Sequence, residues 1–213
     1  MKTKYVYAGL LLLLTLPLFS CGGGDIGTPG SKGSVDTGIV IQSVSIKGVP
    51  TATDLTPDID ANVHVCSVDP TTGIATYESG LFRVTADLTI TATKLNQSGI
   101  GESPFPASLE ECTITYLRAN EDPSAPLIPS LTVYPNCVLS DSAGGNPNVC
   151  NVPLIDIQRK KDFWTALVGG INMPSEYPTH YVAKYVCGYR NGYGRGTFPV
   201  EYDFWIADFE TCN

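Results

Sequence analysis

Strict alternation of apolar and polar residues is the feature of this chain that most restricts its fold. Between residues 82 and 93 every second residue is apolar, and the apolar positions are Phe82, Val84, Ala86, Leu88, Ile90 and Ala92. Successive side chains of a strand point to opposite faces, so this segment is expected to form a strand buried on one face. The same alternation from Phe198 to Ile206 predicts a second strand near the end of the chain.

Shorter apolar segments bounded by Gly, Pro, Asp or Asn predict further strands. They are residues 39–46, 61–68, 112–117, 131–134 and 154–158. One short helix is expected between Asp162, as its N-cap, and the Gly169-Gly170 pair. Short strands with frequent turns predict a mainly β protein, an antiparallel β-sandwich whose strand spacing resembles Ig-like or fibronectin-like modules.

Tyrosines recur at every fourth position near the C-terminus: Tyr177, Tyr181, Tyr185, Tyr189 and Tyr193. A helix or a strand would place them on one face, but the β-branched Val182 and Val186 between them favour a strand. The sequence Asn191-Gly192-Tyr193-Gly194 then predicts the turn of a C-terminal hairpin. We expect the tyrosines to pack in the core. The alternative is an aromatic surface, together with Trp164 and Trp205, that stacks on carbohydrate.

The N-terminus begins with two lysines and an apolar run that ends in Leu18-Phe19-Ser20-Cys21. This pattern resembles the signal peptide and lipobox of bacterial lipoproteins, over residues 1–21. The resemblance implies cleavage after Ser20 and a diacylglyceryl thioether on Cys21. It also implies acylation of the new amino terminus with a fatty acid such as palmitate. Because Gly22 follows the cysteine, the resemblance further implies sorting to the outer membrane. An ordinary secreted protein is the alternative.

The domain organisation expected from this reading has three parts. Residues 1–20 are a signal peptide, residues 21–34 a lipidated, Gly-rich flexible tether, and residues 35–213 a β-sandwich domain. The segment Asp122-Pro123-Ser124-Ala125-Pro126 has the composition of a linker. A subdivision near residues 120–130 therefore stays open, although one domain with a long loop is preferred.

Six cysteines remain after Cys21, an even number that predicts disulfides in an exported protein. They are Cys66, Cys112, Cys137, Cys150, Cys187 and Cys212. The sequence alone does not choose among the pairings, but turn-forming residues between Cys137 and Cys150 favour that pair. No Cys-x-x-Cys spacing supports a thiolate metal site.

The charge and the motifs argue against several functions. The net charge of −8 disfavours binding to nucleic acid, and the one basic run, Arg159-Lys160-Lys161, is expected to be a solvated helix start. No phosphate-binding, dinucleotide-binding or zinc-protease motif occurs. No cofactor is expected apart from the lipid.

A few side chains remain as candidates for chemistry. Asp54, Asp58 and Asp60 form a candidate calcium site. His64 and His180 are expected to be structural, although a hydrolase triad does not need sequence neighbours. Two acidic pairs would suit a glycosidase, and they are Glu110-Glu111 and Asp203/Asp208.

Together these features predict a non-enzymatic lipoprotein of the cell envelope. It would act as a structural or binding module tethered to the outer membrane through its lipid, with envelope proteins or carbohydrate as partners. The alternatives are a carbohydrate-binding or adhesive lipoprotein and, third, a surface hydrolase.

Overall fold

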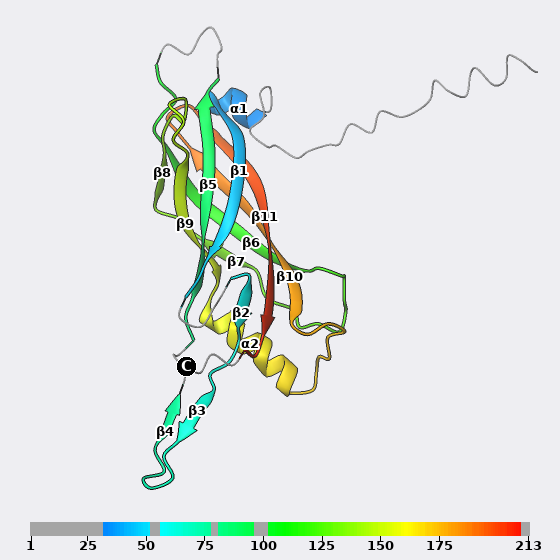
Figure 1. The fold of residues 1–213 in the computed structure, drawn as a ribbon. Helices are drawn as coiled ribbons and strands as arrows, with labels where there is room; N and C mark the ends of the chain where they lie inside the picture. Colours follow the sequence, from blue (N-terminus) through cyan, green and yellow to red (C-terminus); the bar gives the residue numbers. More distant parts are fainter. Residues whose placement is uncertain (1–31, 52–55, 78–80, 96–101, 210–213) are drawn as a thin grey trace, which may run out of the picture.

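The computed structural model describes residues 32–51, 56–77, 81–95 and 102–209, and the statements below concern these residues. The protein is mainly β, with two short helices (Figure 1). In chain order the elements are α1 (Lys32–Thr37), β1 (Ile39–Val49), β2 (Asp58–Asp60), β3 (Val65–Val68), β4 (Ala75–Tyr77), β5 (Val84–Lys94), β6 (Ala107–Arg118), β7 (Leu131–Val133), β8 (Cys137–Leu139), β9 (Asn148–Ile155), α2 (Ile157–Val168), β10 (Thr179–Arg190) and β11 (Arg195–Ala207).

A three-stranded antiparallel sheet, which we call sheet A, has the order β1-β5-β9. Its central strand is the alternating segment, and the apolar residues from Val84 to Ala92 are fully buried. This confirms the strand that the alternation predicts. The start differs by two residues, since Phe82 and Arg83 lie before β5 and are exposed.

A larger sheet, sheet B, has the order β2-β11-β10-β6-β7, and β8 also pairs with β6. The hairpin β10–β11 is in register from Thr179↔Ile206 to Arg190↔Arg195, so the predicted C-terminal hairpin is confirmed. Tyr181, Tyr185 and Tyr189 are buried in the core, as expected, while Tyr177 and Tyr193 lie outside the strand and are exposed.

The two sheets enclose one core, and tyrosines of sheet B bond to sheet A across it. Strand β9 has a register irregularity near Leu154, where Val84 faces Ile155 but Thr85 faces Pro153. A bulged residue is left out of the ladder, so its backbone groups need other partners. The Tyr116 hydroxyl donates to the Leu154 carbonyl at 2.7 Å, and the Tyr185 hydroxyl donates to the Pro153 carbonyl at 2.9 Å. The bulge is therefore stabilised from the opposite sheet.

The sandwich is not clearly of the immunoglobulin type. Sheet B curls into part of a barrel, and its edge strand β2 pairs with β11 in parallel, with Ile206 opposite Ile59 (Figure 1). The expectation of a mainly β fold is thus confirmed, whereas the Ig-like arrangement is not.

Helix α2 corrects two expectations at once. It begins at Ile157, with Asp156 as N-cap accepting from the Arg159 backbone N–H, rather than after Asp162, and it ends before Gly169 as expected. The strand expected at 154–158 therefore stops at Ile155. The basic run is in the first turns of this helix, but Lys160 is fully buried, so the run is not simply solvated.

Other boundaries also differ from those expected. The last part of the expected tether, Lys32–Ser34, belongs to α1, where Gly33 and Ser34 are buried. The strand expected at 61–68 is restricted to Val65–Val68. In the linker-like segment, Ala125 is buried and the Tyr181 hydroxyl donates to the Pro126 carbonyl, so these residues pack against the core.

The two ends of the molecule differ in construction. At one end α1 packs beside the β10–β11 turn, where the Asn191 side chain donates to the Thr37 carbonyl at 2.7 Å. At the other end the hairpin β3–β4 projects beyond α2 as an arm (Figure 1). The structure contains, within its described part, no helix long and apolar enough to cross a membrane.

Candidate functional site: a groove between the two sheets

An open groove lies where the edge strands of the two sheets meet. Strands β7 and β8 form one edge of sheet B, and β9 forms the facing edge of sheet A. The groove has a volume of about 410 Å³, within the range of roughly 300–1,000 Å³ that small-molecule sites occupy. The residues that line it include Arg83, Thr85, Tyr134, Asn136, Asn151 and Pro153.

The walls of this groove are held together covalently. Cys137 on β8 and Cys150 on β9 form a disulfide, as the sequence favours, and each is next in the chain to a lining asparagine. The Asn148 side chain also bridges the two strands: its Oδ1 accepts from the Ser140 backbone N–H, and its Nδ2 donates to the Ser140 carbonyl. The groove is therefore formed before any ligand arrives.

The lining combines an aromatic ring with fixed polar groups. Tyr134, in the turn between β7 and β8, is 76% exposed. The Asn151 amide donates to the Thr85 hydroxyl at 3.2 Å and to Asp87 at 3.0 Å, which fixes its plane and leaves its carbonyl oxygen as the acceptor. Arg83 is the charged residue of the lining. A cation here contrasts with the net charge of −8 of the whole chain.

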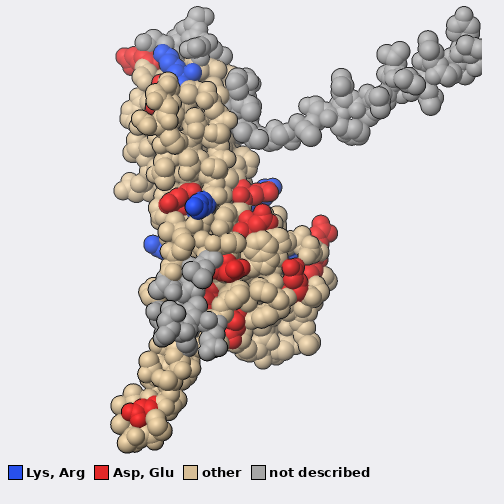
Figure 2. All heavy atoms as spheres, viewed as in Figure 1, with Lys and Arg blue, Asp and Glu red and all other residues tan. Residues whose placement is uncertain are grey.

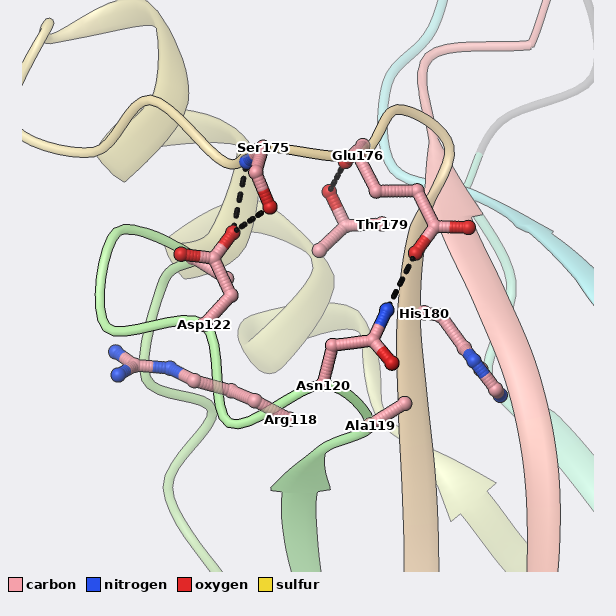
Figure 3. A pocket seen from close by; sticks show the side chains of 9 residues that line it. Arg118, Ala119, Asn120, Asp122, Ser175, Glu176, Thr179 and His180 are labelled. Atoms are coloured by element: carbon pink, nitrogen blue, oxygen red, sulfur yellow. Dashed lines mark hydrogen bonds between the residues drawn. The ribbon is translucent and has the colours of Figure 1, made fainter.

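A second hollow lies between the end of β6 and the loop before β10 (Figure 3). Asp122 accepts from the hydroxyl and the backbone N–H of Ser124 and from the backbone N–H and hydroxyl of Ser175. These donors hold the pKa of its carboxyl well below the ordinary range. Asn120 donates to Glu176 at 3.1 Å. The hollow measures about 10 Å³, room for about one water molecule, so it serves as a tie between two loops.

Each of the two histidines is paired with an acid. His64 lies 2.5 Å from Asp208, and His180 lies 2.9 Å from Asp203. The His180 ring also stacks on Trp205, with 4.3 Å between ring centres and 9° between planes. Ser175, near His180, directs its hydroxyl to Asp122 instead. The acids Asp203 and Asp208 are thus engaged by separate histidines.

The residues predicted for lipid and calcium binding are only partly described. Cys21 and Asp54 lie outside the described residues, so both remain predictions. Asp58 is exposed on β2, whereas Asp60 is buried and accepts from the backbone N–H groups of Asn62 and Phe209. No group of three metal-ligating side chains occurs in the described part of the chain.

The remaining acidic pair and the tryptophans occupy structural positions. Glu110 lies 3.0 Å from Arg190 and 3.5 Å from Arg195. Trp164 packs partly buried against the core, and Trp205 is covered on one face by the imidazole of His180. Tyr134, the exposed aromatic of the groove, belongs to no periodic pattern in the sequence. It lies at the end of the strand expected at 131–134, and the Pro135-Asn136 pair that follows was the one signal of a turn beside it.

The cysteines indicate the compartment. Cys112 and Cys187 join β6 to β10, and Cys137 joins Cys150, so four of the predicted cysteines are paired. Cys66 is disulfide-bonded as well. Cys212 lies outside the described residues. Disulfides persist in oxidising compartments, so they indicate a protein that folds outside the cytoplasm.

Comparison with protein-family models, with curated proteins and with solved structures finds no match to this chain.

Proposed function

We propose that this protein is a non-enzymatic lipoprotein of the cell envelope, anchored to the outer membrane through a lipid on Cys21. The observation that carries the proposal is the position of α1. This first described helix is fastened to the β10–β11 turn, at the opposite end of the long strands from the β3–β4 arm (Figure 1). A tether that enters at α1 would hold the body upright, with the arm away from the membrane.

The rigidity of the body supports a structural or binding role. Strand β5 has 11 residues, which corresponds to roughly 35 Å at about 3.3 Å per residue. Two disulfides, one within sheet B and one between the sheets, stiffen this length. We regard the body as a variant β-sandwich that acts as a spacer and presents its surfaces outside the membrane.

The distribution of charge fits the same orientation. In the view of Figure 2, acidic side chains gather over the half of the molecule that carries α2 and the arm. At the α1 end, Arg190 and Arg195 share the carboxylate of Glu110. An acidic end is repelled by anionic lipid headgroups, so the less acidic α1 end would face the membrane.

Of the alternative functions, carbohydrate binding has a specific observation in its favour. The groove beside Tyr134 presents an exposed ring, one amide fixed by hydrogen bonds at Asn151 and a second amide at Asn136, a combination that suits sugars. A hydrolase has no comparable support, because the Ser175 hydroxyl is bonded to Asp122 and His180 to Asp203.

The anchor is tested by replacing the cysteine and following the protein in cell fractions. Cys21→Ser is expected to move the protein from the membrane pellet to the soluble fraction, whereas the control change Ser31→Ala, ten residues further along, is expected to leave it in the pellet. Mass spectrometry of the wild-type N-terminal peptide should show acyl chains on Cys21. An unmodified peptide that still contains the leucine run, or a Cys21→Ser protein that stays in the pellet, would refute the anchor.

The same peptide map tests the disulfides. If Cys21 carries lipid, Cys212 is the one cysteine left to pair with Cys66, and a cross-linked peptide that contains both is expected. Free thiols on either residue in the unreduced, denatured protein would contradict this pairing.

A further inference from the structure

We propose that the groove between β7–β8 and β9 binds an acidic saccharide, with Tyr134 as the stacking platform and Arg83 as the partner of a sugar carboxylate. This inference goes beyond the anchored module proposed above and does not depend on the lipid. It rests on the shape, the rigidity and the lining of the groove.

The aromatic ring is the first reason. A tyrosine that is 76% exposed on a protein surface gains nothing from the core. By contrast, the three tyrosines of β10, Tyr181, Tyr185 and Tyr189, are buried. The C–H face of a pyranose packs on such a ring and covers its apolar surface, while the sugar hydroxyls stay at the rim. A fully apolar ligand would leave Arg83 and the asparagines desolvated without partners.

The fixed amide groups are the second reason. Asn151 is held in place by Thr85 and Asp87, so its carbonyl oxygen is oriented in advance. Asn136, across the groove, adds a donor and an acceptor on one planar group. Sugar hydroxyls are both donors and acceptors, and two amides on opposite walls match that pattern.

The charge decides the class of saccharide. Arg83 lines the groove, and among the described residues of the lining there is no carboxylate. Asp87, outside the lining, accepts a hydrogen bond from the Asn151 amide. In a chain with 21 acidic and 13 basic residues, a groove whose described lining has a cation and no acid favours an anionic ligand. Arginine binds a carboxylate through two parallel hydrogen bonds. A uronic-acid type of sugar supplies that carboxylate together with the pyranose face.

The rigidity of the walls is the third reason. The Cys137–Cys150 disulfide joins the two edge strands, and the Tyr185 hydroxyl holds the Pro153 carbonyl from beneath. A groove that is already formed loses little conformational entropy when a ligand binds. Pre-organisation matters for saccharides in particular, because each of their contacts is weak.

The test measures binding of oligosaccharides to the full-length protein in detergent micelles by calorimetry. The probes are galacturonic acid oligosaccharides, neutral maltooligosaccharides of the same length, and a short polyglutamate that has charge without sugar. We expect the galacturonate probe to bind best, with an affinity that falls as salt is added. Equal affinity for the neutral sugars would overturn the assignment of Arg83, and equal affinity for polyglutamate would overturn a saccharide site.

Variants connect the binding to the groove. Tyr134→Ala and Arg83→Gln are each expected to weaken galacturonate binding about tenfold, the size expected for one stacked ring or one charged hydrogen bond. Tyr134→Phe should retain binding because the ring is kept. The matched controls are Tyr77→Ala on the arm and Arg195→Gln at the α1 end, both exposed, and neither should change the affinity.

The binding measurements test the saccharide site independently of the lipid anchor. Because Tyr134 and Arg83 are exposed, their variants should unfold at the wild-type temperature, so a loss of binding would report on the groove. Absence of binding to all three probes, or binding that survives Tyr134→Ala, would overturn the inference. A protein that binds galacturonate but carries no lipid would refute the anchor alone.

Discussion

The hydrogen bond from Tyr116 to Leu154 offers the sharpest test of how the two sheets are held together. Its donor is on β6 of sheet B, and its acceptor is the carbonyl at the irregularity of β9 in sheet A, 2.7 Å away and buried. Tyr116→Phe keeps the ring and removes only the hydroxyl. The Leu154 carbonyl would then lose its partner in a place that water does not reach.

The magnitude follows from the cost of an unsatisfied buried acceptor, about 1–3 kcal/mol. Tyr185→Phe removes the neighbouring bond to Pro153, which is only partly buried, so a smaller loss of about 1 kcal/mol is expected. Because the two acceptors are adjacent in β9, the double variant should deviate from the sum of the single losses. Tyr77→Phe, on an exposed tyrosine of the arm, is the control and should change nothing.

The assay is equilibrium unfolding in urea. With a slope of about 2 kcal/mol per molar, the loss for Tyr116→Phe corresponds to a midpoint lower by about 0.5–1.5 M at an unchanged slope. A midpoint equal to that of Tyr77→Phe would show that the hydroxyl does not stabilise the bulge, and the account of the sheet contact would be wrong.

Two further predictions concern the same core. Burial raises the pKa of Tyr116, Tyr181 and Tyr185 above the ordinary value. The folded state therefore binds these protons more tightly than the unfolded state. The contribution of these tyrosines to stability should be fully present up to about pH 10 and be lost as the pH rises further. Full ionisation of the tyrosines, followed by phenolate absorbance, while the protein stays folded would contradict this. Replacing both Cys137 and Cys150 by Ser should lower the free energy of unfolding by about 3 kcal/mol, the value for a short loop. An unchanged urea midpoint would show that the disulfide does not constrain the chain.

The strands with two distinct faces were predictable from the sequence. In β5 and in β10 every second residue is buried and the residues between are polar or half-exposed, so the period of two identifies both the element and its inner face. The C-terminal hairpin was predictable because the residue types at 191–194 favour a turn. In the structure the Asn191 side chain accepts from the Tyr193 and Gly194 backbone N–H groups and stabilises this turn.

The boundary between β9 and α2 was not predictable by the same reasoning. Apolar residues continue through Leu154, Ile155 and Ile157, so alternation and simple hydrophobicity extend the strand too far. The helix begins where Asp156 caps it, and a capping aspartate is a weaker signal than an apolar run. Lys160 was expected to be solvated but is buried, because its exposure depends on the residues that pack against α2 and not on its neighbours in the sequence.

The groove could not be derived from the sequence because its residues share no local pattern. Arg83 precedes β5, Tyr134 follows β7 and Asn151 is on β9. The pairing of β5 with β9 places Arg83 near Asn151, and Tyr134 reaches them because the edges of the two sheets meet beside the Cys137–Cys150 disulfide. The favoured Cys137–Cys150 pair was the one sequence signal near this place. It indicated a covalent contact but not a cavity beside it.

The order of the strands in sheet B also bears on how the molecule is made. Strand β10 lies between β6 and β11, and β10 and β11 come after all the other described strands in the chain. Until residues 179–207 are synthesised, β6 cannot pair with β10 and Cys112 cannot form its disulfide with Cys187. Helix α1 also lacks the β10–β11 turn against which it packs. A chain that lacks these residues therefore cannot close the larger sheet, so the folding of sheet B depends on its C-terminal hairpin.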